Sequence, residues 1–224
     1  MKVNLCDAIY MSGIKYLCSL GTKCHTASFL QRNNLKLTSY PFDWLYSDIK
    51  TVTHCIEDDF KTLLDKHNYI DIGWATENPL GQCGHLIYGT QLFNHRDMRI
   101  DENYYYLIRC VDRFRNLCKK LDKKLFIIWF INGEYNDKGK VIEFNNKFKN
   151  VTSNYTLLCI THNQTDKNEY NITSHSNIDF LDLNTRSRSD GIRFEMEEDN
   201  IFLDNIILNK YVFKLNSICD PIKY

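Results

Sequence analysis

The sequence predicts a three-layer α/β fold, in which a mostly parallel sheet carries helices on both faces. The apolar runs at 15–21, 123–131, 155–163 and 177–184 are nearly continuous, as expected of strands that are buried on both faces. Segments with helical spacing of apolar residues alternate with these runs, which favours parallel strands joined by crossover helices. With 224 residues, 43% of them hydrophobic, the chain suits one core, so we expect a single domain over 1–224.

The first strand is expected to lead directly into a helix. "KYLCSLG" (15–21) is a short apolar run that ends in glycine. "CHTASFLQR" (24–32) follows, with Ala27, Phe29 and Leu30 at spacings that a helix can use. Together they form a βα unit with Cys24 at the joint.

A turn, a helix and a long irregular stretch come next. "SYPFDWLYSD" (39–48) contains a proline and two large aromatic residues, which is typical of a turn. Apolar residues at helical spacing then predict a helix over 47–67, with Ser47 as its N-cap. Residues 71–101 are rich in Gly, Asn and His without a sustained period, so they form either a long loop or short irregular strands.

The second half alternates helices with the three remaining strands. A helix is expected over 101–122, where apolar residues recur at helical spacing after an acidic start, and a short one over "KVIEFNNKFKN" (140–150). In such sheets ligands lie outside the carboxyl ends of the strands, near the point where the strand order reverses. Cys24 lies at the carboxyl end of the first strand, which makes that end the candidate site.

Composition limits the classes of partner. Lys plus Arg and Asp plus Glu are both 28, so no overall field attracts nucleic acid or an anionic membrane, and we expect neither as a partner. No apolar run reaches about 18 residues and charges interrupt the N-terminus, so no membrane helix or signal peptide is expected. The nine cysteines are then expected to be reduced thiols in a cytoplasmic protein. Composition does not indicate the oligomeric state.

Cys24 has the position of a nucleophile. The positive end of a helix lowers a thiol pKa and can hold a developing oxyanion, and a partner imidazole must accept the thiol proton. His95, in a glycine-rich region and close to Asp97, is the best candidate for that imidazole. The alternative is that Cys24 is a small buried apolar residue and His95 a surface histidine.

The segment "SLGTKCHTASFLQRNNLKLTSYPFDWLYSD" (19–48) contains S-L-G-x-x-C, a helix and S-x-P-F-D-W in that order. It resembles the opening signature of a family of unknown function identified as papain-like cysteine peptidases. The resemblance is strongest over 16–48, continues through "YGTQLFNHRDM" (88–98) and fades after residue 124. It implies Cys24 as nucleophile and His95 as base, with Asp43 or Asp97 as third member, and suggests a large DNA virus as the source.

Two other families bear on the fold and the base. Papain-like enzymes place the nucleophile on a long helix against a mainly antiparallel sheet, which is the alternative fold. A strand, a tight turn, a Cys and a helix in a parallel sheet instead resembles SGNH-type hydrolases and cysteine-dependent capsule acyltransferases. Those enzymes carry a late catalytic histidine, whereas no histidine follows His175 here, so the base would be His95, His85 or His175.

We therefore expect a thiol-dependent hydrolase, or an acyl transferase, that acts on a peptide, an ester or a glycan of unknown identity. One alternative is a glycan- or nucleotide-sugar-handling α/β protein in which Cys24 is structural. The other is a non-catalytic viral interaction module. If the protein is viral, the expected compartment is the host cytoplasm.

Candidate substrate-binding residues surround this site in the sequence. His25 and His85 are two, and Arg186, Arg188 and Arg193 follow the strand at 177–184, where they could hold a phosphate or carboxylate. A solvated loop is the alternative for these arginines. Cys83 and His85 lack a second pair at zinc-site spacing, so neither a metal nor another cofactor is expected.

Asp43 lies between Phe42 and Trp44, two residues that favour a buried position. A buried carboxylate needs hydrogen-bond partners, because burying even a neutral polar group without them costs about 2 to 7 kcal/mol. We expect backbone N–H groups near residues 21–24 to supply those bonds. Asp43 would then tie the second motif to the nucleophile turn and shape the site without transferring a proton.

Overall fold

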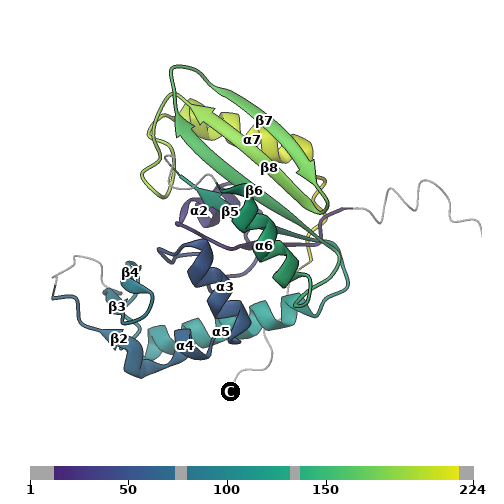
Figure 1. Ribbon diagram of the computed structural model, residues 1–224. Helices are drawn as coiled ribbons and strands as arrows, with labels where there is room; N and C mark the ends of the chain where they lie inside the picture. The colour runs from purple at the N-terminus through teal and green to yellow at the C-terminus, as the bar shows by residue number, and fades with distance from the viewer. Residues whose placement is uncertain (1–12, 74–79, 132–136, 217–224) are drawn as a thin grey trace, which may run out of the picture.

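The computed structural model describes residues 13–73, 80–131 and 137–216, and its main sheet is mostly parallel. Its strands, in spatial order, are β1 (Tyr16–Ser19), β5 (Lys124–Phe130), β6 (Tyr155–Gln164), β8 (Ile178–Thr185) and β7 (Glu169–His175). Neighbouring strands are parallel from β1 to β8, and β7 pairs antiparallel at the edge (Figure 1). The predicted parallel sheet is confirmed, in place of the mainly antiparallel sheet of the papain-like alternative.

Helices cover both faces of this sheet, as predicted. One face packs against α3 (Ile49–Glu57), α5 (Asp101–Cys118) and α6 (Lys138–Phe148), and the other against α2 (His25–Arg32) and α7 (Glu197–Lys210). Figure 1 shows α6 in front of the sheet and α7 behind it. Successive residues of β5 point alternately into the two cores, so both faces must be apolar. This explains the continuous apolar run "LFIIWF" in the sequence.

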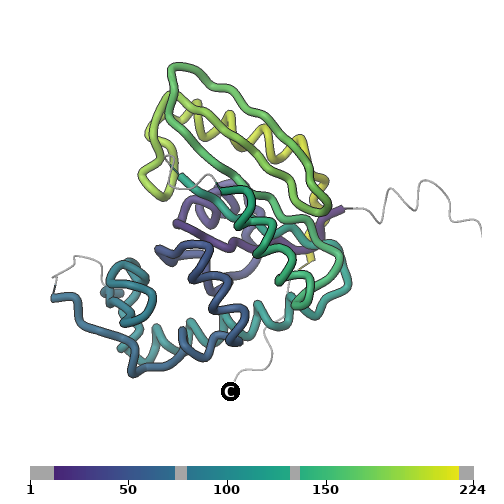
Figure 2. Tube along the Cα trace, in the orientation of Figure 1, coloured from purple at the N-terminus to yellow at the C-terminus, as the bar shows by residue number. Residues whose placement is uncertain are grey.

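The strand order differs from the expectation at one point. The parallel strands follow one another in chain order, so the expected reversal of order is absent from this part of the sheet. β1 is therefore an edge strand, and it pairs with β5 although more than a hundred residues separate them, as the adjacent purple and green tubes show (Figure 2). Cys24 still lies at the carboxyl edge of the sheet, where ligands bind in this architecture.

The helix expected over 47–67 is broken. α3 ends at Glu57, and α4 (Lys61–Leu64) and a 3₁₀ turn (Lys66–Asn68) follow. Asp59 and Phe60 have φ values of 53° and 61°, a left-handed conformation that an α-helix cannot pass through. The tertiary structure holds Phe60 in this conformation because its ring fills the core. The N-cap of α3 is Asp48, which accepts a bond from Thr51 N at 2.7 Å, and not Ser47.

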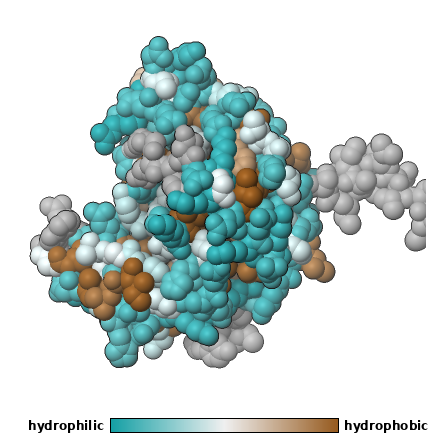
Figure 3. Space-filling model, in the orientation of Figure 1, coloured by the Kyte–Doolittle hydropathy of each residue, from teal (hydrophilic) through white to brown (hydrophobic). Residues whose placement is uncertain are grey.

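A second, antiparallel sheet consists of β2 (Tyr69–Ile70), β3 (Cys83–His85) and β4 (Gly89–Phe93). Of the two alternatives for the stretch 71–101, the part described from residue 80 onward contains short strands, and residues 74–79 lie outside the described residues. The small sheet lies beside the main one at the left of Figure 1. Figure 3 shows a brown apolar patch over this region, where Leu86 and Ile87 are exposed in the turn between β3 and β4.

Every cysteine in the described part of the chain is a free, buried thiol. They are Cys18, Cys24, Cys55, Cys83, Cys110, Cys118 and Cys159. No helix of the described segments has the length and apolar character that spanning a membrane requires.

Candidate active site

Cys24 is held by the main-chain pairing of the parallel sheet. The chain keeps pairing with β5 beyond the end of β1, through Trp129 N–H to the Gly21 carbonyl at 2.9 Å and Thr22 N–H to the Trp129 carbonyl at 3.2 Å. Cys24 is then the N-cap residue of α2 and makes no side-chain bond to that helix. The Cys24 sulfur therefore does not cap the helix and can bond to another group.

The turn before Cys24 requires glycine at position 21. Gly21 has φ +88°, and a Cβ atom there would lie 2.7 Å from the hydroxyl of Ser47. Any other residue would meet both the left-handed strain and this contact. The glycine of the S-L-G-x-x-C pattern thus follows from the close approach of two segments.

The structure brings Cys24 and His95 together. The Cys24 sulfur lies 3.1 Å from His95 Nε2, although 71 positions separate the two residues. Trp44 stands edge-on to the imidazole, with ring centroids 6.3 Å apart and planes at 81°. Cys24 is only 7% exposed, so the contact is largely sheltered from water. The late histidine of an SGNH-type site is not used, because His175 lies beside Ile178 at the amino end of β8, the opposite edge of the sheet.

The segment after Pro41 forms hydrogen bonds with both regions that carry the Cys24–His95 pair. Tyr46 N–H donates to the Leu92 carbonyl of β4 at 3.0 Å, and Ser47 N–H donates to the Thr22 carbonyl at 2.8 Å. Two consecutive amides therefore join the strand that leads to His95 and the turn that leads to Cys24. The two motifs are linked in space, as expected, but through backbone amides.

Asp43 does not make this link, which corrects the expectation. It is 1% exposed and accepts bonds from the Tyr40 amide, at 3.0 Å, and from the Lys36 ammonium group. Burial raises the pKa of the Asp43 carboxyl, and Lys36 offsets that increase only in part. Its contacts are thus within residues 36–43, and none of them is to the backbone of residues 21–24. Asp43 organises its own turn.

Asp97 is not bonded to His95 within the described residues. Arg99 donates to its carboxylate from both the side chain, at 2.7 and 2.9 Å, and the backbone, at 2.9 Å. Burial raises the pKa of Asp97, but the bonds from Arg99 outweigh burial and leave it below its ordinary value. Asn103 also donates to the Asp97 carbonyl at 3.0 Å. These bonds fix the loop that carries His95 into α5.

The electrostatic surroundings keep both members of the pair neutral. Burial, followed by the negative charge of Asp43, raises the pKa of the Cys24 thiol to about 12, while Lys23 pulls it down. Burial lowers the pKa of His95 below its ordinary value. The expectation that the helix N-terminus lowers the thiol pKa is therefore wrong in net effect, because removal from water dominates. The resting pair is a thiol beside a neutral imidazole.

Lys23 is a basic residue next to Cys24 that the sequence analysis does not predict as part of the site. It is 5% exposed, and its ammonium nitrogen lies 3.0 Å above the centre of the Tyr46 ring. A buried cation next to Cys24 favours the thiolate over the thiol. A lysine adjacent to the nucleophile in sequence is a weak signal, since most lysines are exposed.

His25 lies in the core and not at the site. Its ring is fully buried, stacks on Trp129 with centroids 3.8 Å apart, and bonds to Ser189 Oγ through Nδ1 at 2.8 Å. Its other ring nitrogen, Nε2, is buried and has no hydrogen-bond partner among the residues that the structure describes. A substrate role for His25 would require opening this packing.

His85 is also a structural residue. It is 1% exposed in the small sheet, where Nδ1 accepts bonds from the amides of Ile87 and Tyr88, each at 3.2 Å, and Nε2 donates to the Thr62 carbonyl at 3.1 Å. With both ring nitrogens occupied, it serves as neither base nor substrate contact in this structure.

The three arginines proposed for substrate lie on a loop that borders the site. His25 bonds to Ser189 in this loop, and the charge of Asp190 raises the pKa of Cys24. Arg186 lies 3.8 Å from the buried Asp199, and Arg188 lies 3.5 Å from Glu195. Arg193 is exposed. The loop follows β8 at the carboxyl edge of the sheet, as the sequence predicts. Two of its arginines, Arg186 and Arg188, lie near carboxylates of the chain itself.

The described residues contain no cluster of three His, Cys, Asp or Glu side chains that could hold a metal ion. The arrangement at the carboxyl edge of the sheet is instead a thiol, an imidazole and a helix N-terminus. Those three groups suit nucleophilic attack on a carbonyl carbon.

Comparison with known proteins identifies the family of the chain. Residues 15–165 match the family described as "Putative papain-like cysteine peptidase (DUF1796)". The chain belongs to this family. It is also 30% identical over 185 residues to an uncharacterised protein of Acanthamoeba polyphaga mimivirus, an alignment that covers 70% of this chain and 82% of the viral protein. No solved structure matches the chain.

Proposed function

We propose that the protein is a cysteine-dependent hydrolase of the peptidase type, with Cys24 as nucleophile and His95 as general base. The observation that carries the proposal is the 3.1 Å contact between the Cys24 sulfur and His95 Nε2 at the N-terminus of α2. Membership of the cysteine peptidase family supports the same chemistry.

The neutral pair sets the order of the first step. A thiol with a pKa of about 12 is a poor nucleophile at neutral pH, so the proton must leave as the bond forms. His95 Nε2 accepts the thiol proton while the sulfur attacks the substrate carbonyl carbon. The protonated imidazole then gives that proton to the leaving group, and an acyl-thioester remains on Cys24.

The second step regenerates the enzyme with the same residues. Neutral His95 accepts a proton from water as the water oxygen attacks the thioester carbonyl carbon. The carbon–sulfur bond breaks, the acid product leaves, and His95 returns the proton to Cys24.

The first turn of α2 can stabilise the oxyanion. Cys24 provides no side-chain cap, so the first amides of the helix point outward next to the sulfur. Those N–H groups carry roughly half a positive charge in sum, which favours a negative oxygen that forms beside Cys24.

Alkylation by iodoacetamide tests the pair without knowledge of the substrate. We expect Cys24 to react at least about ten times faster than Cys118 at pH 7, because His95 removes its proton. Cys118 is the matched control, since it is 8% exposed, against 7% for Cys24, and burial raises its pKa to about 12 as well. Peptide mass mapping measures each rate.

The pH profile separates a base-assisted thiol from a resting thiolate. The rate at Cys24 should rise with pH through the depressed pKa of His95, below 6.5, and level off near neutrality. Equal rates for Cys24 and Cys118 across this range would contradict the proposal. Cys24→Ser should remove hydrolysis of a fluorogenic peptide library and leave the melting temperature within a few degrees.

A further inference from the structure

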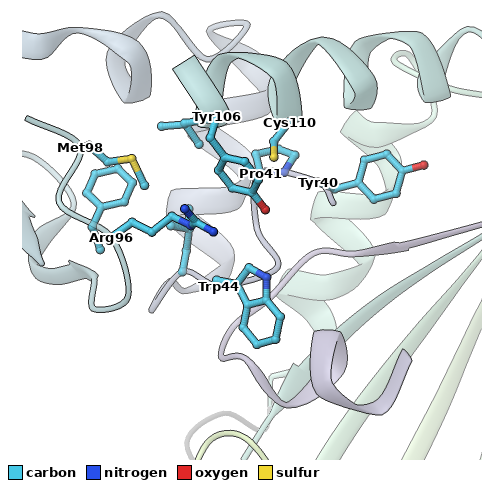
Figure 4. A pocket seen from close by; sticks show the side chains of 10 residues that line it. Tyr40, Pro41, Trp44, Arg96, Met98, Tyr106 and Cys110 are labelled. Carbon is cyan, nitrogen blue, oxygen red and sulfur yellow. The ribbon is translucent and has the colours of Figure 1, made fainter. Parts of the chain in front are cut away.

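A narrow pocket includes Trp44, the residue that stands edge-on to His95, in its lining. Its wall is formed by Tyr40, Pro41, Trp44, Arg96 and Tyr106, with apolar side chains beneath (Figure 4). The free volume is about 20 Å³, which is room for little more than one water-sized group. The pocket therefore suits the tip of a side chain and not a whole ring.

Arg96 is the charged group in this wall. Figure 4 shows its side chain reaching between Tyr106 and Trp44. The guanidinium carbon lies 4.2 Å from the centre of the Tyr106 ring, and one nitrogen donates to Asn103 Oδ1 at 3.3 Å. These contacts hold the guanidinium in place, and among the described residues they leave most of its N–H donors without an acceptor.

The chain pairs other arginines of similar exposure with carboxylates. Arg32 bonds to Asp204, Arg99 to Asp97 and Arg115 to Asp59. In the segments that the structure describes, Arg96 has no carboxylate partner, although it is half-buried. A half-buried guanidinium against an aromatic ring, with donors directed into a pocket, is the usual arrangement for binding an anion.

The pocket and the reacting pair share one wall. Trp44 lines the pocket and stands edge-on to the His95 ring. Arg96 also follows His95 directly in the chain. A substrate group in this pocket would thus be separated from the His95 ring by Trp44, within the reach of a substrate whose carbonyl carbon lies at Cys24.

We infer that this pocket, with Arg96 as its anion-binding residue, receives a carboxylate of the substrate and selects acidic substrates over their neutral amide counterparts. Selection of a substrate rests on the proposed function, whereas the binding of a carboxylate by Arg96 does not depend on it. The carboxylate could belong to an acidic side chain or to a chain terminus, and the two sources are tested separately below.

The first experiment measures selectivity in the reaction of Cys24. Acetyl-aspartyl and acetyl-asparaginyl chloromethyl ketones differ only in charge, as do the longer acetyl-aspartyl-alanyl and acetyl-asparaginyl-alanyl reagents. In each case the Cys24 sulfur bonds to the methylene carbon, chloride leaves, and His95 takes the thiol proton. We expect the acidic reagent to react at least about tenfold faster than the amide in one of the two pairs.

Variants assign that preference to Arg96. Arg96→Gln should bring the ratio of rates close to one, and Arg96→Lys should retain part of it. Arg109→Gln, which removes an exposed arginine from α5, should leave the ratio unchanged. A preference that persists in Arg96→Gln would overturn the inference, and so would equal rates for both pairs in the wild-type protein together with no shift of Arg96 in the titration described next.

The second experiment does not require a reactive cysteine. The Nε–H resonance of Arg96, assigned by its loss in Arg96→Lys, is followed by NMR during titration with three probes. N-acetyl-aspartic acid amide offers a side-chain carboxylate, N-acetyl-alanine a terminal carboxylate, and N-acetyl-asparagine amide neither. A shift with one carboxylate probe and none with the neutral probe supports the pocket and identifies the source.

The two experiments fail separately. If Cys24 reacts with no reagent but Arg96 shifts with a carboxylate, the proposed function fails and the anion pocket stands. If Cys24 reacts equally with all reagents and Arg96 shifts with none, the hydrolase stands and the pocket is wrong. If Arg96→Gln lowers the melting temperature, so that its reaction rates cannot be compared, the titration of the wild-type protein still tests whether Arg96 binds a carboxylate.

Discussion

The two regions that meet at the candidate site are built in different ways. The turn that carries Cys24 continues the ladder between β1 and β5, so backbone bonds of the parallel sheet fix it. The loop that carries His95 is fixed mainly by side-chain bonds, those of Arg99 and Asn103 to Asp97, beside one backbone bond from the Asp97 amide to the Leu80 carbonyl at 2.8 Å. Cys24 therefore belongs to the general fold, and His95 belongs to a small unit inserted beside it.

Two histidines sharpen this comparison. His25 follows Cys24 directly in the chain but packs into the core on the face of α7, because neighbours on a helix point to different sides. His95 is 71 positions away and contacts the sulfur. Distance along the chain is thus a poor guide to the partner of a residue at a helix N-terminus.

The largest expected effect separates those histidines. His95→Asn should slow alkylation of Cys24 by iodoacetamide about 10²- to 10³-fold with the free energy of unfolding nearly unchanged, because it removes the base. His25→Asn should instead lower the free energy of unfolding by about 2 kcal/mol, since it leaves a gap beside Trp129. Mass-mapped alkylation and urea unfolding measure the two effects. The comparison breaks if His25→Asn slows alkylation without loss of stability.

The next effect concerns the buried ion pair of the motif turn. Asp43→Asn should destabilise the protein by about 3 to 5 kcal/mol, because it leaves the Lys36 ammonium group without its buried partner. Lys36→Met combined with Asp43→Asn should recover part of that loss, since no uncompensated charge then remains. Urea unfolding of the four proteins in this cycle gives both values. A smaller loss for Asp43→Asn than for the double variant would show that the pair is not the main stabilising contact.

A third prediction tests the core on the α7 face through pH. Burial lowers the pKa of His162 to about 4, and it lowers that of His25 well below the ordinary value. Both residues therefore stabilise the fold in the neutral form, fully above about pH 6.5, and this contribution is lost as the pH falls toward 4. The decrease for His162 alone is about 3 kcal/mol at most, from the difference between 6.5 and about 4.

Urea unfolding at pH 7.0 and 4.5 measures this loss. His162→Gln is the control, because a side chain that does not titrate should make the decrease smaller. A decrease of the same size in His162→Gln and in the wild-type protein would assign the acid sensitivity to other groups.

The smallest effect tests the close approach at the nucleophile turn. Gly21→Ala should cost about 2 kcal/mol or more, because alanine meets both a left-handed φ and the Ser47 hydroxyl. Gly191→Ala is matched, with φ +98° and open space around the new Cβ, so it should cost only the backbone strain of about 1 kcal/mol. If both variants lower the stability in thermal unfolding equally, the Ser47 side chain moves aside without an energetic penalty.

Much of the main sheet could be predicted because its signals are local. β5, β6 and β8 are apolar on both faces, and α5 keeps its apolar residues at helical spacing, so each element is recognisable alone. β7 was missed because it is an exposed edge strand with the polar sequence "EYNITSH". α7 was missed as well, although Leu203, Ile206 and Ile207 pack against the sheet.

The candidate site also has a part that the local sequence predicts and a part that it does not. The sequence by itself determined that a cysteine follows a buried strand at the start of a helix, because strand, glycine turn and helix are each encoded by neighbouring residues. Only the tertiary structure decided that His95 is within 3.1 Å of Cys24 and that Asp43 is not part of the link. It also decided that the thiol is protonated, since desolvation depends on every segment packed around it and cannot be read from residues adjacent to it in the chain.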